Sequence, residues 1–112
     1  MQKPNKLVIA IIQEQDVPIL IDDLIEKGHR VTRLATTGGF LKAGNTTLLI
    51  GVREEVVDEV FSIIEDNCRT REVRTTMLSG TVPGDAFLPY PVEVRIGGAT
   101  IFVLDIDDFI QI

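Results

Sequence analysis

Residues 7–28, which read LVIAIIQEQDVPILIDDLIEKG, decide the fold of this 112-residue chain. They begin with a continuous apolar run, the pattern of a central strand that is covered on both faces. Apolar side chains then recur at helical spacing and form one stripe that can face a sheet: Val17, Leu20, Ile21, Leu24 and Ile25. Asp16 offers an N-cap side chain, Pro18 suits the first turn, and Gly28 can close the helix in the left-handed conformation. The stretch therefore predicts a strand followed at once by a helix that packs against a sheet.

The same strand and helix signals continue along the chain. Further strands are expected at residues 30–37, 46–52, 71–76, 92–96 and 99–104. A second helix is predicted by a second apolar stripe: Val57, Val60, Phe61 and Ile64. Gly97-Gly98 predicts a tight hairpin between the last two strands. The order predicts an α+β fold: a ferredoxin-like β-α-β-β-α-β sandwich with an extra C-terminal hairpin strand, in which both helices cover one face of an antiparallel sheet.

Composition indicates one globular domain over residues 1–112, because a core of this size rarely divides further. Hydrophobic residues make up 45% of the chain and the mean hydropathy is +0.22, although only 5% of residues are aromatic. A domain this small buries only roughly two-thirds of the surface that its unfolded chain exposes. The surplus of apolar side chains therefore predicts a subunit interface, and hence an oligomer.

Several classes of protein do not fit this sequence. There is no stretch of 18 or more apolar residues, so membrane insertion is not expected. The apolar run at residues 7–12 is too short for a signal peptide and has no cleavage site after it. The single cysteine, Cys68, cannot build a disulfide framework and is expected to be a small, buried, apolar residue. These features predict a cytoplasmic protein.

The distribution of charge is more informative than its sum. The net charge of −6 argues against non-specific binding to nucleic acid. Between Lys27 and Arg53, however, five basic residues occur without an acidic one, so this basic island carries +5 and the remainder of the chain −11. A basic island in an acidic protein suggests a small anionic ligand. A chance cluster of solvated charges is the alternative that charge alone leaves open.

The basic island contains the most unusual segment, residues 34–47, which read LATTGGFLKAGNTT. Its glycines permit backbone N–H groups to approach phosphate oxygens closely. Phe40 could stack on a nucleobase, and Asn45 carries the donor and acceptor that pair with an adenine edge. The alternative is a hairpin whose Phe40 folds back onto the core. Gly39 and Gly44 have the spacing of a phosphate loop, but Asn45 replaces its lysine and a strand replaces its helix, which argues against NTPase chemistry.

Catalytic groups are scarce. His29 is the only histidine, and at a helix terminus it is expected to be a surface residue satisfied by the last carbonyls. Without a second histidine or a usable cysteine, a nucleophile–base pair cannot be assembled. Asp105, Asp107 and Asp108 are expected to form a solvated edge rather than a magnesium site. The sequence therefore predicts no enzymatic activity, no metal ion and no cofactor.

Three groups of residues resemble the PII-like cyclic-di-AMP receptor family. They are residues 30–47 (RVTRLATTGGFLKAGNTT), the N-terminal strand with residues 13–16 (QEQD), and residues 89–94 (PYPVEV) with 97–100 (GGAT). The resemblance covers the chain from about residue 7 to its end and is weakest between residues 71 and 88. It implies a homotrimer of ferredoxin-like subunits that binds one cyclic-di-AMP, without hydrolysing it, in each cleft between neighbours. It also implies loops at residues 36–45 and 77–88 that ligand binding orders, and a protein partner that the sequence does not name.

By position, the resemblance implies ligand contacts from ten residues. They are Arg30, Val31, Thr32, Gly39, Phe40, Leu41, Asn45, Gly51, Phe102 and Gln111. The first three would face the phosphates, with Val31 contributing its backbone. The next three would line one adenine pocket, whose base edge the asparagine would read. Gly51 would leave room for the ligand, and the last two would close the site. Ile112 stands where the family pattern has an aromatic residue, so the C-terminal contact departs from that pattern.

Three rival functions remain at this point. The first is a nitrogen-type PII regulator that binds ATP and 2-oxoglutarate, but its long signalling loop does not fit the short connector between Gly38 and Asn45. The second is a purely structural trimer that uses Phe40 and Leu41 for packing alone. The third, a small phosphate-chemistry enzyme, would need a general base and metal ligands that the sequence does not supply.

Overall fold

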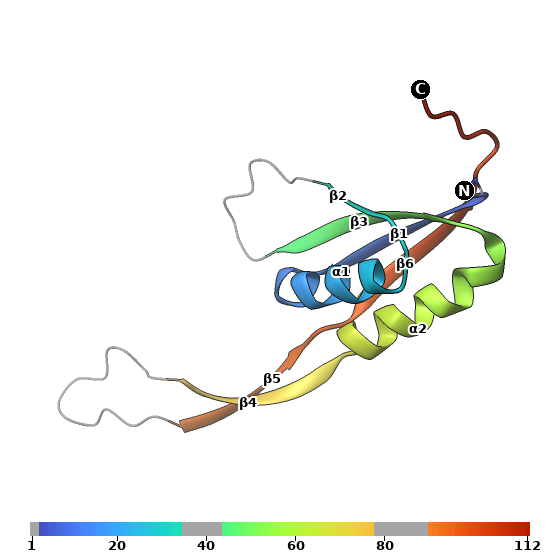
Figure 1. Cartoon of the computed structure of the whole chain (residues 1–112). Helices are drawn as coiled ribbons and strands as arrows, with labels where there is room; N and C mark the ends of the chain where they lie inside the picture. Colours follow the sequence, from blue (N-terminus) through green and yellow to red (C-terminus); the bar gives the residue numbers. More distant parts are fainter. Residues whose placement is uncertain (1–2, 35–43, 78–89) are drawn as a thin grey trace.

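The computed structural model describes residues 3–34, 44–77 and 90–112 (Figure 1). In these ranges the chain forms strands β1 (Lys6–Gln13), β2 (Val31–Leu34), β3 (Asn45–Val52), β4 (Arg71–Met77), β5 (Tyr90–Ile96) and β6 (Ala99–Asp105). It also forms helices α1 (Val17–Glu26) and α2 (Val57–Cys68), which follow the 3₁₀ turns η1 (Glu14–Asp16) and η2 (Glu54–Val56). The predicted α+β class and the positions of both helices are confirmed.

The main sheet has the strand order β2-β3-β1-β6, and every neighbouring pair is antiparallel. This is a ferredoxin-like arrangement, with both helices on the same side of the sheet (Figure 1). Successive side chains of a strand point to opposite faces, so each central strand sends one set of apolar residues towards the helices. The buried set consists of Val8, Ala10 and Ile12 from β1 and Leu48, Ile50 and Val52 from β3.

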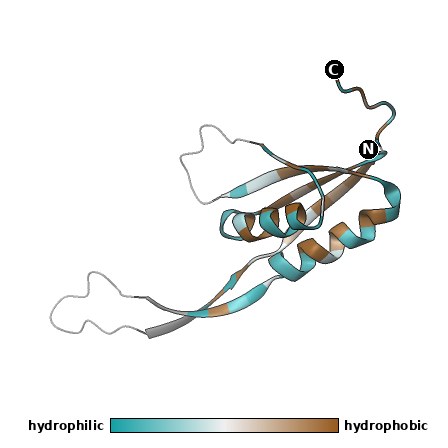
Figure 2. Cartoon of the chain, in the orientation of Figure 1, coloured by the Kyte–Doolittle hydropathy of each residue, from teal (hydrophilic) through white to brown (hydrophobic). Residues whose placement is uncertain are grey.

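The helices close this core with their predicted stripes (Figure 2). In α1, Val17, Leu20 and Leu24 are buried, whereas Ile25 is 58% exposed, so its predicted place in the stripe is wrong. Ile25 lies eight residues after Val17. Because one helical turn takes 3.6 residues, its side chain has rotated away from the sheet. Gly28 ends the helix with φ +88°, as expected. Cys68 is buried at the end of α2, and burial, assisted by the charge of Asp16, raises the pKa of its thiol to about 11.

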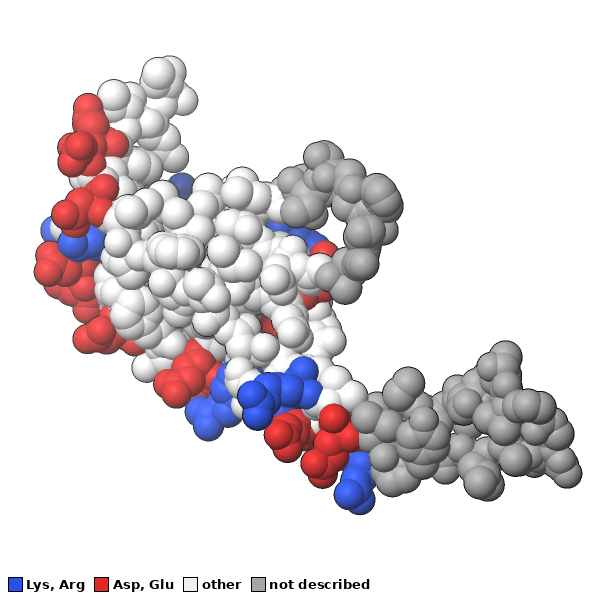
Figure 3. Space-filling view, turned by 180° about the vertical axis from the view of Figure 1, so that it is seen from behind, with Lys and Arg blue, Asp and Glu red and all other residues white. Residues whose placement is uncertain are grey.

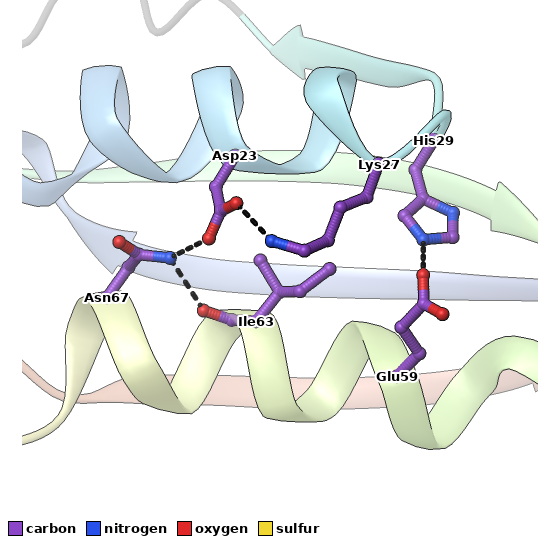
Figure 4. A network of polar contacts seen from close by, with 6 residues as sticks. All are labelled: Asp23, Lys27, His29, Glu59, Ile63 and Asn67. Carbon is purple, nitrogen blue, oxygen red and sulfur yellow. Dashed lines mark hydrogen bonds and ion pairs between the residues drawn. The ribbon is translucent and has the colours of Figure 1, made fainter.

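Polar contacts join the two helices along their outer edge (Figure 4). Asn67 on α2 donates from Nδ2 to Asp23 Oδ2 on α1 at 2.9 Å, and Lys27 donates to the other carboxylate oxygen of Asp23 at 2.5 Å. These hydrogen bonds hold the pKa of Asp23 below its usual value, and the bond from Lys27 contributes most. His29 Nε2 lies 2.7 Å from Glu59 Oε2 and its side chain is only 9% exposed. The expectation that His29 is a surface residue bonded to helix carbonyls is therefore wrong.

The two-stranded sheet β4-β5 projects from the body as an arm (Figure 1). The predicted hairpin at Gly97-Gly98 is not formed, because β5 pairs with β4 whereas β6 pairs with β1. Both glycines have positive φ, of 89° and 98°, and the chain passes from one sheet to the other there. A Cβ on Gly97 would lie 2.5 Å from the carbonyl oxygen of Arg69. The extra hairpin is therefore β4-β5, and the last strand completes the main sheet.

A polar junction fixes the base of the arm to the body. Asp16, predicted as an N-cap, precedes α1 but makes no capping hydrogen bond. Its buried carboxylate accepts instead from Arg71 Nη2 at 2.7 Å, and this bond raises the pKa of Arg71. Gln13 Oε1 accepts from the backbone N–H of Gly97 at 2.8 Å. The segment Gln13–Asp16 thus holds both strands that lead into the arm.

Replacing Arg71 by alanine leaves the buried Asp16 carboxylate without its partner, so we expect the melting temperature to fall by several degrees. A loss of 1 kcal/mol lowers the melting temperature of a domain of this size by roughly 4–8 °C. Arg74→Ala is the matched control, because Arg74 lies on the same strand and its 3.8 Å contact with Glu93 is exposed. Thermal unfolding measures both variants, and equal melting temperatures would contradict a structural role for the junction.

Candidate functional site

The face of the main sheet opposite the helices is apolar and uncovered in the single chain. Its residues lie in rows across the strands, because paired residues of neighbouring strands share a face. One row is Thr32, Leu49, Ile9 and Phe102, and the next is Gly51, Leu7 and Leu104. We call this surface the open face. The view from behind shows charged side chains gathered along the margin and a broad uncharged middle (Figure 3). Phe102 and Leu104 are 51% and 48% exposed.

A pocket of about 620 Å³ lies at the end of the open face where β3 terminates. It is lined by Pro4, Leu7, Gly28, His29, Arg30, Thr32, Leu49, Gly51, Val52, Arg53, Val56, Ile106, Phe109 and Gln111. These residues come from the N-terminal segment, the segment after α1, the strands β1, β2 and β3, the turn η2 and the C-terminal segment. The volume is within the range of pockets that bind cofactors and drug-sized ligands.

The pocket has a cationic side. Arg30 and Arg53 line it together with His29, and its described lining contains no carboxylate. Carboxylates do lie just behind this side: Glu59 contacts the His29 ring, and Glu55 Oε1 is 3.8 Å from Arg53 Nε. Arg30 makes no ion pair with any residue in the described ranges. The arrangement therefore favours an anionic ligand.

The remaining wall is apolar and held by backbone contacts. Asn5 donates its N–H to Val52 O at 3.0 Å and accepts from Ile106 N–H at 3.0 Å, so the two ends of the chain lie together beside the pocket. Lys6 and Asp105 form an ion pair next to this crossing. Phe109 and Gln111 follow directly and line the pocket. Such an apolar wall beside cationic groups suits a ligand that combines a flat base with phosphates.

The structure brings together four of the ten residues with expected ligand contacts: Arg30, Thr32, Gly51 and Gln111. Val31 lies between the first two, and its side chain packs against the core on the helix side of the sheet. Only its backbone is therefore available, in the role expected for it. Three others, Gly39, Phe40 and Leu41, lie outside the described residues.

Two expected contact residues lie away from this pocket within one chain. Asn45 begins β3 opposite Gln13, at the other end of the strand from Gly51. Phe102 lies on the open face in the same row as Thr32, three strand spacings away, which is about 14 Å. A single subunit does not bring these residues to the pocket that contains Arg30.

Sequence reasoning missed several residues of the pocket wall, among them His29, Arg53 and Phe109. For the arginine a signal was present, because Arg53 is the last member of the basic island and Arg30 belongs to the same island. No such signal pointed to Phe109, because the acidic residues of the C-terminal segment suggested a solvated edge. Among residues 3–34, 44–77 and 90–112, no cluster of side chains suits a metal ion, and neither described helix could cross a membrane.

Comparisons with known proteins show which family the chain belongs to. The family model described as cyclic-di-AMP receptor matches residues 5–112. The chain belongs to the cyclic-di-AMP receptor family. The chain is also similar to a functionally unknown protein from Pediococcus pentosaceus ATCC 25745, whose crystal structure is 43% identical in sequence. The match covers 99% of this chain and 100% of that one, with a TM-score of 0.75. Membership of a receptor family supports a role in binding cyclic-di-AMP.

In this member of the cyclic-di-AMP receptor family, ligand binding should be sensitive to a larger side chain at Gly51, which lines the pocket. A Cβ there would meet the Pro4 side chain at 3.4 Å, an ordinary contact, so alanine should fold normally. The branched side chain of Gly51→Val would extend from the open face into the pocket. We expect Gly51→Val to weaken cyclic-di-AMP binding by roughly tenfold or more, and Gly51→Ala less, at nearly unchanged melting temperature. Wild-type affinity for the valine variant in calorimetric titration would exclude the pocket as the ligand site.

Proposed function

We propose that this protein is a non-enzymatic, cytoplasmic signalling receptor that binds one cyclic-di-AMP per subunit in clefts between the subunits of a homotrimer. The observation that carries the proposal is the position of the pocket: a cationic cavity opens at the edge of an uncovered apolar sheet face. A second subunit that covers the open face would also border the pocket. Family membership supplies the identity of the ligand.

The open face supports the assembly. Patches of exposed apolar surface rimmed by charged residues mark interaction sites in soluble proteins. In this chain the open face is continuous over the strands β3, β1 and β6 and includes the half-exposed Phe102. Three copies related by a threefold axis would each cover a neighbour and close the assembly. The homotrimer thus removes from water the surplus of apolar side chains that the composition indicates.

The expected ligand contacts divide between two subunits in this arrangement. Arg30 and Thr32 would bind a phosphate, beside the backbone of Val31, and Gly51 would admit a base next to Gln111. Phe102 is too far from the pocket of its own chain and would stack on the ligand held by a neighbour. Asn45, with Gly39, Phe40 and Leu41, would hold the second adenine at the opposite end of β3.

Ligand binding would signal by rearranging residues 36–45 and 77–88, which changes the surface offered to a protein partner. The described contacts supply a route between the two segments. Glu14 N–H donates to Gly44 O at 3.2 Å, and the Gln13 side chain accepts from Gly97. Asp16 then binds Arg71 at the start of the arm. Residues 13–16 therefore contact Gly44, next to the first segment, and the base of the arm, whose strands lead to the second, so a shift at Gly44 would reach the arm through them.

Isothermal titration calorimetry with cyclic-di-AMP tests the proposed function, with ATP, cyclic-di-GMP and 2-oxoglutarate as comparators. We expect saturable binding of cyclic-di-AMP alone at one per subunit. Asn45→Ala and Arg30→Ala should each weaken it, because each removes hydrogen bonds to a buried polar ligand. Binding of ATP with 2-oxoglutarate instead would indicate a nitrogen-type regulator. No heat and no thermal shift with any ligand would leave a purely structural trimer.

Hydrogen exchange tests the proposed signalling step. Cyclic-di-AMP should slow amide exchange within residues 36–45 and 77–88, because ordering a segment places its N–H groups in hydrogen bonds. The amides of β1 serve as the internal control, since this central strand pairs on both sides without ligand. Equal protection of both segments in the free and bound protein would contradict the proposed rearrangement while leaving binding intact.

A further inference from the structure

Arg53 is a cationic residue of the pocket to which the family resemblance assigns no contact. It follows β3 directly, two residues beyond Gly51, and its backbone is extended, with φ −82° and ψ 151°. It lines the same pocket as Arg30. The two arginines are also members of the basic island. Because both line one pocket, these two members of the island favour the anionic ligand over the chance cluster of charges that the sequence left as an alternative.

One hydrogen bond holds the guanidinium of Arg53 in place, but it does not use all of the N–H donors of the group. Its Nη1 donates to the carbonyl oxygen of Lys3 at 3.1 Å, which fixes one edge of the group. Glu55 Oε1 lies 3.8 Å from Nε, beyond hydrogen-bonding distance. Nε itself is buried and has no hydrogen-bond partner among the described residues. A guanidinium has five N–H donors, so donors remain for a ligand that enters the pocket.

Two arginines elsewhere in the fold, Arg71 and Arg33, are engaged more closely by carboxylates. Arg71 donates to Asp16 at 2.7 Å and Arg33 donates to Glu14 at 3.2 Å, both within hydrogen-bonding distance. The contact between Arg53 and Glu55 is longer, and the Arg53 side chain is 39% exposed. A phosphate oxygen in the pocket could therefore bind the guanidinium without first breaking a close ion pair. The planar fork of donors matches a phosphate in geometry as well as in charge.

We propose that Arg53 is a second phosphate-binding residue of this pocket and makes it selective for ligands with two negative charges. Arg30 binds one phosphate and Arg53 attracts the other. A dianionic ligand therefore gains binding free energy from both arginines, whereas a monoanionic ligand gains it from only one. The identity of the ligand rests on the proposed function. Glu55, as the nearest carboxylate, competes with the ligand for Arg53 and lowers the affinity.

The test uses Arg53→Gln and Glu55→Gln, with Arg69→Gln as the matched control that removes the same charge from an exposed residue outside the pocket lining. Titration with cyclic-di-AMP at low and high salt should show a roughly tenfold weaker affinity and a smaller salt dependence for Arg53→Gln. Arg69→Gln should match the wild type, and Glu55→Gln should bind about two- to threefold more tightly. Melting temperatures without ligand establish that each variant is folded.

Inorganic pyrophosphate separates this inference from the proposed function, because it carries the charges without the bases. It should raise the melting temperature of the wild type and of Arg69→Gln, but much less that of Arg53→Gln. Failure of cyclic-di-AMP to bind the wild type, with this pyrophosphate pattern intact, would refute the proposed function and leave Arg53 as an anion-binding residue. Equal affinity and salt dependence for Arg53→Gln and wild type, or equal pyrophosphate shifts, would overturn the inference.

Discussion

Two helices are enough to cover one face of a four-stranded sheet, and in this chain they leave the other face bare. The helix-facing residues of β1 and β3 are buried, whereas the open face retains Phe102 and Leu104 half-exposed to water. Exposed apolar area of this kind is costly for a chain of 112 residues, which has few other means of stabilisation. The need to cover the open face is the physical reason for the assembly that we propose and for the position of its sites between subunits. The pocket lies at the edge of this uncovered face.

The pocket combines this apolar edge with charge drawn from distant parts of the chain. Arg30 follows the first helix, Arg53 follows β3, and residues of the C-terminal segment line the same pocket. Gly51 on β3 has no side chain to fill the pocket, and Pro4 lies beside it. At the other end of β1 from the pocket, the side chains of Gln13 and the buried Asp16 tie the arm to the body. In the signalling step that we propose, the segment Gln13–Asp16 connects Gly44 with the base of the arm.

Local sequence patterns were sufficient to predict the helices and strands, but contacts between residues distant in the sequence could not be predicted from them. The apolar run of β1 and the stripe of α1 follow from burial on a sheet, so they appear in the sequence itself. Positive φ at Gly97-Gly98 is equally compatible with a hairpin and with a change of sheet, and the pairing of β6 with β1 decides between them. Asp16 has the residue type of an N-cap, yet its partner is 55 residues away. Arg30, Thr32, Gly51 and Gln111 came from the family resemblance, whereas Arg53 required the folded pocket.

Mixed trimers test the central claim, that each site is shared by two subunits. Arg30→Ala and Phe102→Ala are expected to bind cyclic-di-AMP poorly when each is purified alone. When the two variants are co-expressed, some clefts combine an intact Arg30 from one subunit with an intact Phe102 from its neighbour. Random assembly should restore wild-type affinity in about a quarter of the clefts, which calorimetry of the mixed trimers detects as a high-affinity fraction. No recovery in verified mixed trimers would contradict a shared site and would place both contacts within one chain.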